Sequence, residues 1–148
     1  SYLRINKAGE KCLYNKTPSL LPGRPEFLKI GSSLEKLILS TGALAELAID
    51  IWESNENIRA NWSVASLPLW GESTRKETFN TLKNYKQIVS MEEHLLSGGF
   101  GSWLLEMGLN CKCIALDSNV CGEVGTQDYL KSKFNLNKKN IIQSILQF

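Results

Sequence analysis

One stretch, from Gln87 to Gly108, constrains the fold more than any other part of the chain. It opens with an apolar run containing β-branched Ile88 and Val89, which is typical of a short buried strand. A glycine cluster follows, and then apolar residues recur at helical spacing, namely Phe100, Trp103, Leu104 and Met107. Glycine suits places where the backbone takes a positive φ or approaches another element closely. The stretch therefore predicts a strand, a tight turn and a helix that begins against the strand.

In the rest of the chain, strand-type runs also alternate with segments of helical periodicity. Strand-type runs at 27–30, 37–39, 64–67 and 113–116 are interspersed with segments of helical periodicity, of which 43–52 is the clearest. This alternation predicts a three-layer α/β/α domain around a mostly parallel sheet of roughly five strands, joined by right-handed crossovers. We expect 27–30 to be an edge strand.

Helix starts are expected where a short polar side chain precedes a periodic segment. Ser73, Thr126 and Asn137 stand at such positions, so each is predicted to cap the helix that follows it. The helix that begins near residue 43 is expected to end close to Asn55.

Three turns should meet at one edge of this sheet, because the carboxyl ends of parallel strands share an edge. They are the turn at Gly42, the turn from Pro68 to Gly71, and the turn from Glu92 to Gly101. We call this edge the carboxyl rim and expect it to be the contact surface.

Motifs in three places resemble the carboxy-terminal domain of the transketolase family of thiamine-diphosphate enzymes. In that family a Glu-Glu-His or Glu-Asp-His strand end leads into a Gly-Gly-x-Gly-Ser helix start. The matching residues are Glu92, Glu93, His94, Gly98, Gly99, Gly101 and Ser102. Upstream, 37–42 (LILSTG) is similar to the family's Ile-Leu-Ser-Thr-Gly strand end. Downstream, 125–130 (GTQDYL), with Phe134 and Leu136, is similar to its closing stretch.

The resemblance implies a division of the chain. Residues 1–8 would end a preceding pyrimidine-binding domain, 9–25 would be a linker, and 26–148 would be the carboxy-terminal domain. Arg4 matches a position that can face the substrate's phosphate, which implies a substrate-binding role; the alternative is an exposed arginine on an edge strand.

The resemblance also implies a function for the whole enzyme. Family members bind thiamine diphosphate and Mg²⁺ between a pyrophosphate-binding and a pyrimidine-binding domain, and they transfer two-carbon ketol units between sugar phosphates. This chain has no Gly-Asp-Gly cofactor motif. It is therefore expected to hold no catalytic residue, cofactor or metal of its own and to be inert alone. Its partners would be the two cofactor-binding domains, as a homodimer or heterotetramer in which it supports the dimer and borders the active-site entrance.

Other identities stay open at this point. Deoxyxylulose-phosphate synthase and the β subunit of 2-oxo-acid dehydrogenases share this domain. The alternative from a different class is a free-standing module whose glycine turn, at a helix start, binds an anion or nucleotide. The glycines match neither a dinucleotide fingerprint nor a P-loop, so close packing is the better interpretation.

Individual side chains near the turn are ambiguous. His94 is a candidate acid, base or substrate ligand, or simply a hydrogen-bond partner of a carboxylate. Glu92 and Glu93 are adjacent in a strand end, so their side chains should point to opposite faces. Together with the glycines and Ser102 they are expected to form the interface or rim rather than a catalytic pair.

Composition excludes several classes of partner. The 148 residues are 43% hydrophobic and 22% charged, with a formal net charge of +2 from interspersed acidic and basic residues. No basic stripe predicts nucleic-acid binding, and no apolar run approaches the roughly 20 residues that span a bilayer. Without a recognisable leader, a cytoplasmic location is expected. Cys111 and Cys113 should share one face of a strand as small buried residues, and their spacing does not match a structural zinc site.

Overall fold

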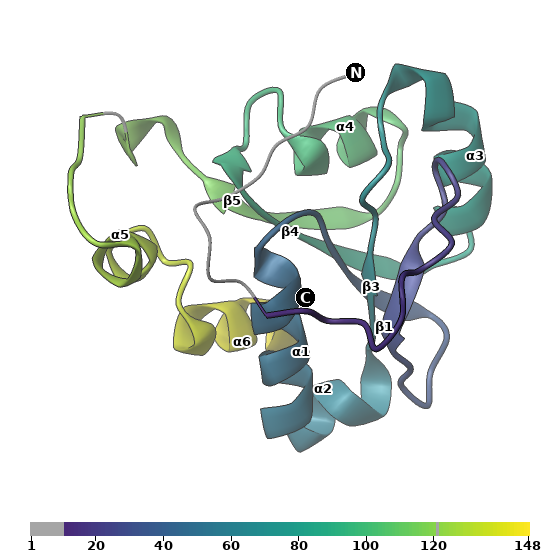
Figure 1. Cartoon of the computed structure of the whole chain (residues 1–148), viewed down its shortest axis with the longest axis horizontal. Coiled ribbons are helices and arrows are strands. Elements are labelled where there is room, and N and C mark those ends of the chain that lie inside the picture. The colour runs from purple at the N-terminus through teal and green to yellow at the C-terminus, as the bar shows by residue number, and fades with distance from the viewer. Residues whose placement is uncertain (1–10, 121) are drawn as a thin grey trace.

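Five strands form one mixed sheet in the computed structural model, which describes residues 11–120 and 122–148 (Figure 1). The strands are β1 (Glu26–Lys29), β2 (Lys36–Ser40), β3 (Ser63–Ser66), β4 (Gln87–Leu95) and β5 (Cys111–Leu116). Their order across the sheet is β1-β3-β2-β4-β5. β1 is antiparallel to β3, whereas the other three neighbouring pairs are parallel. The predicted mostly parallel sheet with an edge strand near residue 27 is confirmed.

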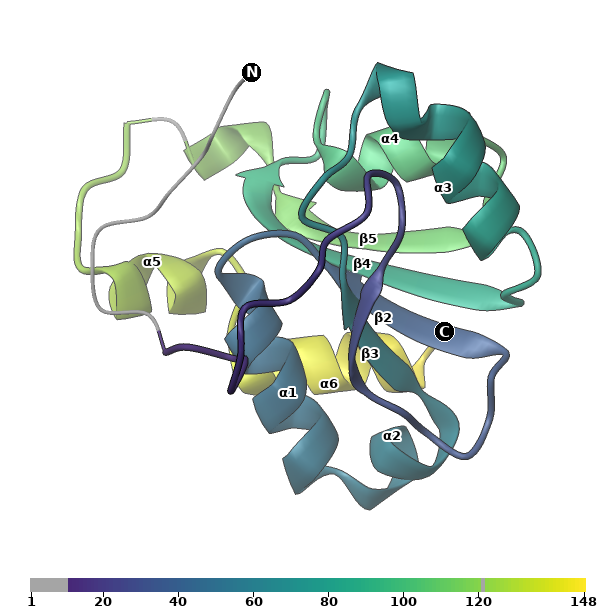
Figure 2. The ribbon, with the colours of Figure 1, turned by 45° about the vertical axis from the view of Figure 1, so that its right-hand side comes forward.

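Helices cover both faces of the sheet (Figure 2). They are α1 (Leu44–Ser54), α2 (Glu56–Asn61), α3 (Arg75–Leu82), α4 (Phe100–Glu106), α5 (Gln127–Lys133) and α6 (Lys138–Leu146). Short 3₁₀ turns occur at Glu72–Thr74 and Ser118–Val120. α1, α2 and α6 pack on one face, and α3 and α4 pack on the other.

The central strand β2 shows why the sheet needs both layers. Ile38 belongs to the apolar cluster beneath α1 and α6, while Leu37 and Leu39 belong to the cluster beneath α3 and α4. All three side chains are fully buried. Successive strand residues point to opposite faces, so a strand covered on both sides reads as a continuous apolar run.

Two of the three predicted caps are confirmed. The Thr126 hydroxyl accepts a hydrogen bond from the Tyr129 amide at 3.3 Å, and the Asn137 side chain accepts one from the Asn140 amide at 3.0 Å.

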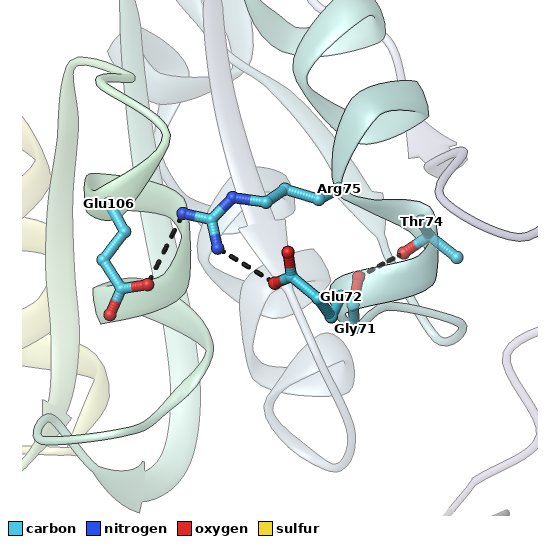
Figure 3. Close-up of polar contacts among 5 residues, drawn as sticks. All are labelled: Gly71, Glu72, Thr74, Arg75 and Glu106. Atoms are coloured by element: carbon cyan, nitrogen blue, oxygen red, sulfur yellow. Dashed lines mark hydrogen bonds and ion pairs between the residues drawn. The ribbon is translucent and has the colours of Figure 1, made fainter.

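The cap predicted at Ser73 is wrong. Thr74 occupies the capping position of α3, and no side chain caps that helix. The Thr74 hydroxyl instead donates to the Gly71 carbonyl at 3.0 Å (Figure 3). The 3₁₀ turn at Glu72–Thr74 precedes the helix and places Ser73 inside that turn, which moves the start of α3 onward along the chain.

The helix from residue 44 ends at Ser54, close to the predicted position, but α2 was not predicted. Asn55 lies between the two helices and serves both. Its amide donates to the Ile51 carbonyl at 3.1 Å, and its side chain accepts from the Ile58 amide at 3.0 Å. Because one residue ends α1 and caps α2, no loop separates them.

Residues 11–25 contain no helix or strand; they begin beside α1, where Lys11 pairs with Glu46, and reach α3 near Gly23 (Figure 1). The Gly23 amide donates to the Leu69 carbonyl at 2.8 Å, and the Thr78 hydroxyl donates to the Gly23 carbonyl at 3.2 Å. The division into a preceding domain, a linker and a carboxy-terminal domain stays a prediction. Residues 1–8, including Arg4, lie outside the described residues. Within the described part of the chain, no helix combines the length and apolar content needed to cross a bilayer.

Candidate functional site

The three turns at the carboxyl rim meet around Trp70. Its indole N–H donates to the Thr41 hydroxyl at 3.2 Å, which joins the turn after β3 to the turn after β2. Its ring lies against Phe100, with centroids 5.1 Å apart, and against Trp103 at 5.2 Å. Those two residues open the helix that follows β4. The sequence prediction that these turns converge on one rim agrees with these contacts.

β4 is longer than predicted. The apolar pattern indicated an end near Met91, but the strand continues to Leu95. Its register with β5 shifts between Met91 and Leu95. Glu92, Glu93 and His94 therefore lie on an irregular strand extension rather than in a turn, and their side chains diverge.

Glu92 caps the start of α4 from inside the protein. The side chain is almost fully buried, and its two carboxylate oxygens accept hydrogen bonds from the Phe100 and Gly101 amides, each at 2.7 Å. Amides at a helix start lack partners within the helix, and a negative charge there is stabilised by the helix dipole. The charge-assisted bonds fix β4 to α4. The chain's own carboxylate thus occupies the amides that could have received a ligand anion.

Backbone conformation and close packing restrict three positions, in the turn after β4 and at the start of α4, to glycine. Gly98 has φ +72°, a left-handed conformation that other residues rarely adopt. A Cβ on Gly99 would lie 2.6 Å from a Glu92 carboxylate oxygen, and a Cβ on Gly101 would lie 2.6 Å from the Cys113 sulfur. Close packing explains Gly99 and Gly101. The sequence analysis preferred this interpretation to anion binding.

The other residues that were predicted to form the rim have different contacts from one another. The Ser102 hydroxyl donates to the Gly99 carbonyl at 2.9 Å and so belongs to the same turn. Glu93 points to the opposite face and pairs with Lys131 of α5 at 2.8 Å. His94 is exposed, with Nδ1 2.9 Å from the Leu95 carbonyl.

The cationic side chain of Arg75, near the rim, is paired with two carboxylates. Arg75, at the start of α3, pairs with Glu72 at 3.1 Å and with Glu106 of α4 at 3.5 Å (Figure 3). It borders an open depression of about 470 Å³ between α3 and α4, which Phe79 and Met107 also line. Two carboxylates therefore already pair with the guanidinium of Arg75 at the edge of this depression.

Sequence reasoning placed Cys111 and Cys113 correctly on one face of β5 but expected them to be buried, and both are half-buried. A hydrogen bond from the Cys111 thiol lowers the pKa of the Cys113 thiol to about 7. The same interaction, followed by burial, raises the pKa of Cys111. The hydrogen bond therefore favours ionisation of Cys113 over that of Cys111.

The described residues do not fit a magnesium-bound diphosphate. Among residues 11–120 and 122–148, no three His, Cys, Asp or Glu side chains are grouped so as to hold a metal ion. The amides at the start of α4 already bind Glu92. No step of a reaction is therefore assigned to a cofactor bound by this part of the chain.

Comparisons with known proteins agree with the resemblance seen in the motifs. No protein-family model matches the sequence. The chain is 27% identical over 150 residues to 1-deoxy-D-xylulose-5-phosphate synthase of Methylacidiphilum infernorum, a match that covers 95% of this chain and 23% of that protein. It is 40% identical over 98 residues to the enzyme of the same name from Heliobacterium modesticaldum, covering 60% of this chain and 14% of that protein. One subunit of the apulose-4-phosphate transketolase of Actinobacillus succinogenes is 22% identical over 108 residues, covering 72% of this chain and 33% of that protein.

Solved structures give the same fold. A split-gene transketolase, described as an inactive β4 tetramer, matches 95% of this chain and 46% of its own with a TM-score of 0.76 at 18% identity. The transketolase of Campylobacter jejuni matches 97% of this chain and 20% of its own with a TM-score of 0.65 at 14% identity. The chain therefore has the fold of a transketolase carboxy-terminal domain, as its motifs predicted. The chain spans about a third or less of the length of the curated relatives that it matches.

Replacing Glu92 by Gln tests the internal cap. The amide side chain offers one uncharged acceptor to two helix amides, so Glu92→Gln is expected to lower the free energy of unfolding by about 1–3 kcal/mol. Urea denaturation of the variant and of the unchanged protein measures the difference in the free energy of unfolding. The control is Glu35→Gln, which removes an exposed pair with Lys86 and should change stability by less than about 0.5 kcal/mol. Equal small effects of the two substitutions would contradict the cap.

Alkylation tests the thiol pair. Cys113 should react with iodoacetamide with a midpoint near pH 7, because the thiolate is the nucleophile. Removing the donor in Cys111→Ala should shift that midpoint upward, toward the ordinary thiol value. Peptide mapping by mass spectrometry follows Cys113 alone. An unchanged midpoint in Cys111→Ala would show that the neighbouring thiol does not activate Cys113.

Proposed function

We propose that this chain is the carboxy-terminal domain of a thiamine-diphosphate-dependent enzyme of the transketolase type, which transfers two-carbon ketol units between sugar phosphates. The observation that carries the proposal is that 95% of the chain matches part of a split-gene transketolase in fold. The motifs at residues 37–42, 92–102 and 125–130 and the curated relatives support the same assignment.

The chain contributes structure rather than chemistry to that enzyme. Its described residues offer no site for thiamine diphosphate and Mg²⁺, so the pyrophosphate- and pyrimidine-binding domains hold both. Those domains are its partners, within one polypeptide or as a second subunit. The matches to a split-gene transketolase and to a protein named as one subunit of a transketolase support the second arrangement. A homodimer or heterotetramer in the cytoplasm is part of the proposal.

The carboxyl rim borders the entrance to the active site in this proposal. Glu92 fixes the strand extension to α4, and this geometry leaves the neighbouring His94 exposed beside it. The exposed imidazole of His94 is proposed to bind the substrate's phosphate. Arg4 is proposed to contact the same phosphate.

1-Deoxy-D-xylulose-5-phosphate synthase is the second candidate, and a specific observation favours it. Two curated relatives carry this name, and one of them is 40% identical over 98 residues. The domain would have the same accessory role there, but the complete enzyme would form 1-deoxy-D-xylulose 5-phosphate.

Co-expression with the cofactor-binding part of the enzyme tests the proposal. The isolated chain should neither bind thiamine diphosphate nor catalyse transfer, whereas the assembled protein should do both with thiamine diphosphate and Mg²⁺ present. Assaying ketol transfer and 1-deoxy-D-xylulose 5-phosphate formation side by side separates the two candidates. An isolated chain that binds a nucleotide or sugar phosphate tightly would instead establish the free-standing module.

His94→Ala in the assembled enzyme tests the phosphate contact. Losing a hydrogen bond to a charged group costs about 1.5–3 kcal/mol, so KM for the phosphorylated sugar should rise about 10- to 150-fold. KM for the unphosphorylated sugar should stay unchanged. Lys83→Ala is the control, because Lys83 is exposed where α3 ends, toward the opposite edge of the sheet. Equal effects on both sugars would remove His94 from the substrate site.

A further inference from the structure

We propose that Cys111 and Cys113 form a peroxide-reactive dithiol, in which a hydroperoxide oxidises Cys113 and Cys111 then closes a disulfide with it. We call these two residues the β5 dithiol. The inference goes beyond the proposed function and does not depend on it, because it uses only side chains of this chain and concerns a modification rather than the transfer reaction.

The β5 dithiol lies on one face of a strand at the edge of the described sheet. Residues two apart in a strand point to the same side. Here that side faces α4, because Cys111 packs against the apolar cluster beneath the helix and a Cβ on Gly101 would lie 2.6 Å from the Cys113 sulfur. Both cysteines are free and only half-buried. Packing therefore positions the two sulfurs and still leaves them accessible to a molecule as small as a hydroperoxide.

Ser90 of β4 adds a hydroxyl to this cluster. It stands opposite Cys113 in the parallel pairing of β4 with β5, and it is fully buried. A Cβ on Gly101 would also lie 2.6 Å from the Ser90 hydroxyl oxygen, so this oxygen and the Cys113 sulfur meet at one place beneath α4. A hydroxyl and a second thiol are both able to donate hydrogen bonds to a thiolate.

These contacts select Cys113 as the nucleophile. The hydrogen bond from Cys111 lowers the pKa of Cys113 to about 7, and contact with Ser90 acts in the same direction. Burial and the carboxylate of Glu92 act against both. The thiolate is the form that attacks a peroxide, so Cys113 is reactive at neutral pH.

The oxidation balances with a hydroperoxide as the oxidant. The Cys113 thiolate attacks one peroxide oxygen, the O–O bond breaks and an S–O bond forms, which gives a sulfenic acid, while the other oxygen leaves and takes up a proton. The Cys111 sulfur then attacks the Cys113 sulfur. An S–S bond replaces the S–O bond, and the departing hydroxide takes the Cys111 proton and leaves as water. The two sulfurs together lose two electrons, which reduce the peroxide.

Cys111 is suited to the second step. Its pKa is raised first by the hydrogen bond to Cys113, and then by burial and by the negative charge of Cys113. A sulfenic acid carries no such charge, so the first step weakens the hold on the Cys111 proton. Residues two apart in a strand have Cα atoms about 6.6 Å apart, near the upper end of the range that a disulfide bridges. No described strand pairs with the outer side of β5, so closing the disulfide breaks no ladder there.

Controlled oxidation of the 148-residue chain tests the proposal. The variant Cys121→Ser retains the β5 dithiol and Cys12, and trypsin separates these three thiols by cleaving after Lys11, Lys16 and Lys112. The reduced protein is treated with a small molar excess of hydrogen peroxide at neutral pH and quenched in denaturant with N-ethylmaleimide. Peptide mapping by mass spectrometry then reports which thiols still accept the maleimide label.

Both thiols of the β5 dithiol should lose their labels together and regain them after reduction. A non-reducing gel should show the disulfide within one chain. Cys12 is the matched control, because it is exposed but donates to the Tyr14 carbonyl at 3.1 Å, a bond that only the protonated thiol makes. It should keep its label under the conditions that oxidise the dithiol.

Two substitutions separate the roles of the cysteines. Cys113→Ala removes the nucleophile, so oxidation of Cys111 should be slower by about fivefold or more. Cys111→Ala removes the resolving thiol, so Cys113 should stop at the sulfenic acid, which dimedone traps as a stable adduct. Urea denaturation checks that each variant is folded.

Three results would overturn the inference. In the first, Cys111 keeps its label while Cys113 is oxidised; in the second, the disulfides form only between chains. In the third, Cys12 is oxidised as fast as Cys113, which would show that the β5 dithiol has no special reactivity. Failure of this chain to restore ketol transfer on assembly would remove the proposed function and leave the dithiol result standing.

Discussion

The buried carboxylate of Glu92 is the contact on which the functional edge of this protein depends. An ionised group inside a protein is unfavourable unless it is paired or hydrogen-bonded, and two helix amides satisfy this one. The need to reach them explains the extension of β4, the absence of a side chain at Gly99 and the close approach of α4 to the sheet, which in turn leaves no room for a side chain at Gly101 beside Cys113. That position of α4 in turn brings Phe100 and Trp103 against Trp70. One ionic interaction thus organises the strand end, the helix start and the aromatic cluster.

The fold was largely predictable, because periodicity reports which faces of an element are buried. β2 is covered on both sides and reads as an uninterrupted apolar run, and Thr126 and Asn137 cap the helices they precede. The failures have local causes. Glu92, Glu93 and His94 look like a polar turn, so the extension of β4 past Met91 was missed. α2 was missed because one residue, Asn55, ends the preceding helix and caps the next, leaving no loop to signal a boundary.

The site was less predictable than the fold, because its contacts join residues far apart in the sequence. Adjacency alone indicated that Glu92 and Glu93 diverge, but only the structure gives Glu92 the α4 amides and Glu93 the ammonium of Lys131. The position of Trp70 depends on Phe100, thirty residues onward, and no local pattern carries that information. The described rim residues are engaged mainly in packing contacts and hydrogen bonds with one another.

The strand order has a consequence for how the domain is built. β1 precedes β2 in the chain, yet it pairs only with β3, on the far side of β2. Pairing of β1 with β3 encloses β2, α1 and α2, so closing that non-local contact is entropically costlier than pairing β2 with β3 across α1 and α2 alone. The strand order therefore favours assembly outward from the middle of the sheet, with the edge strand β1 joining after β2 and β3 have paired.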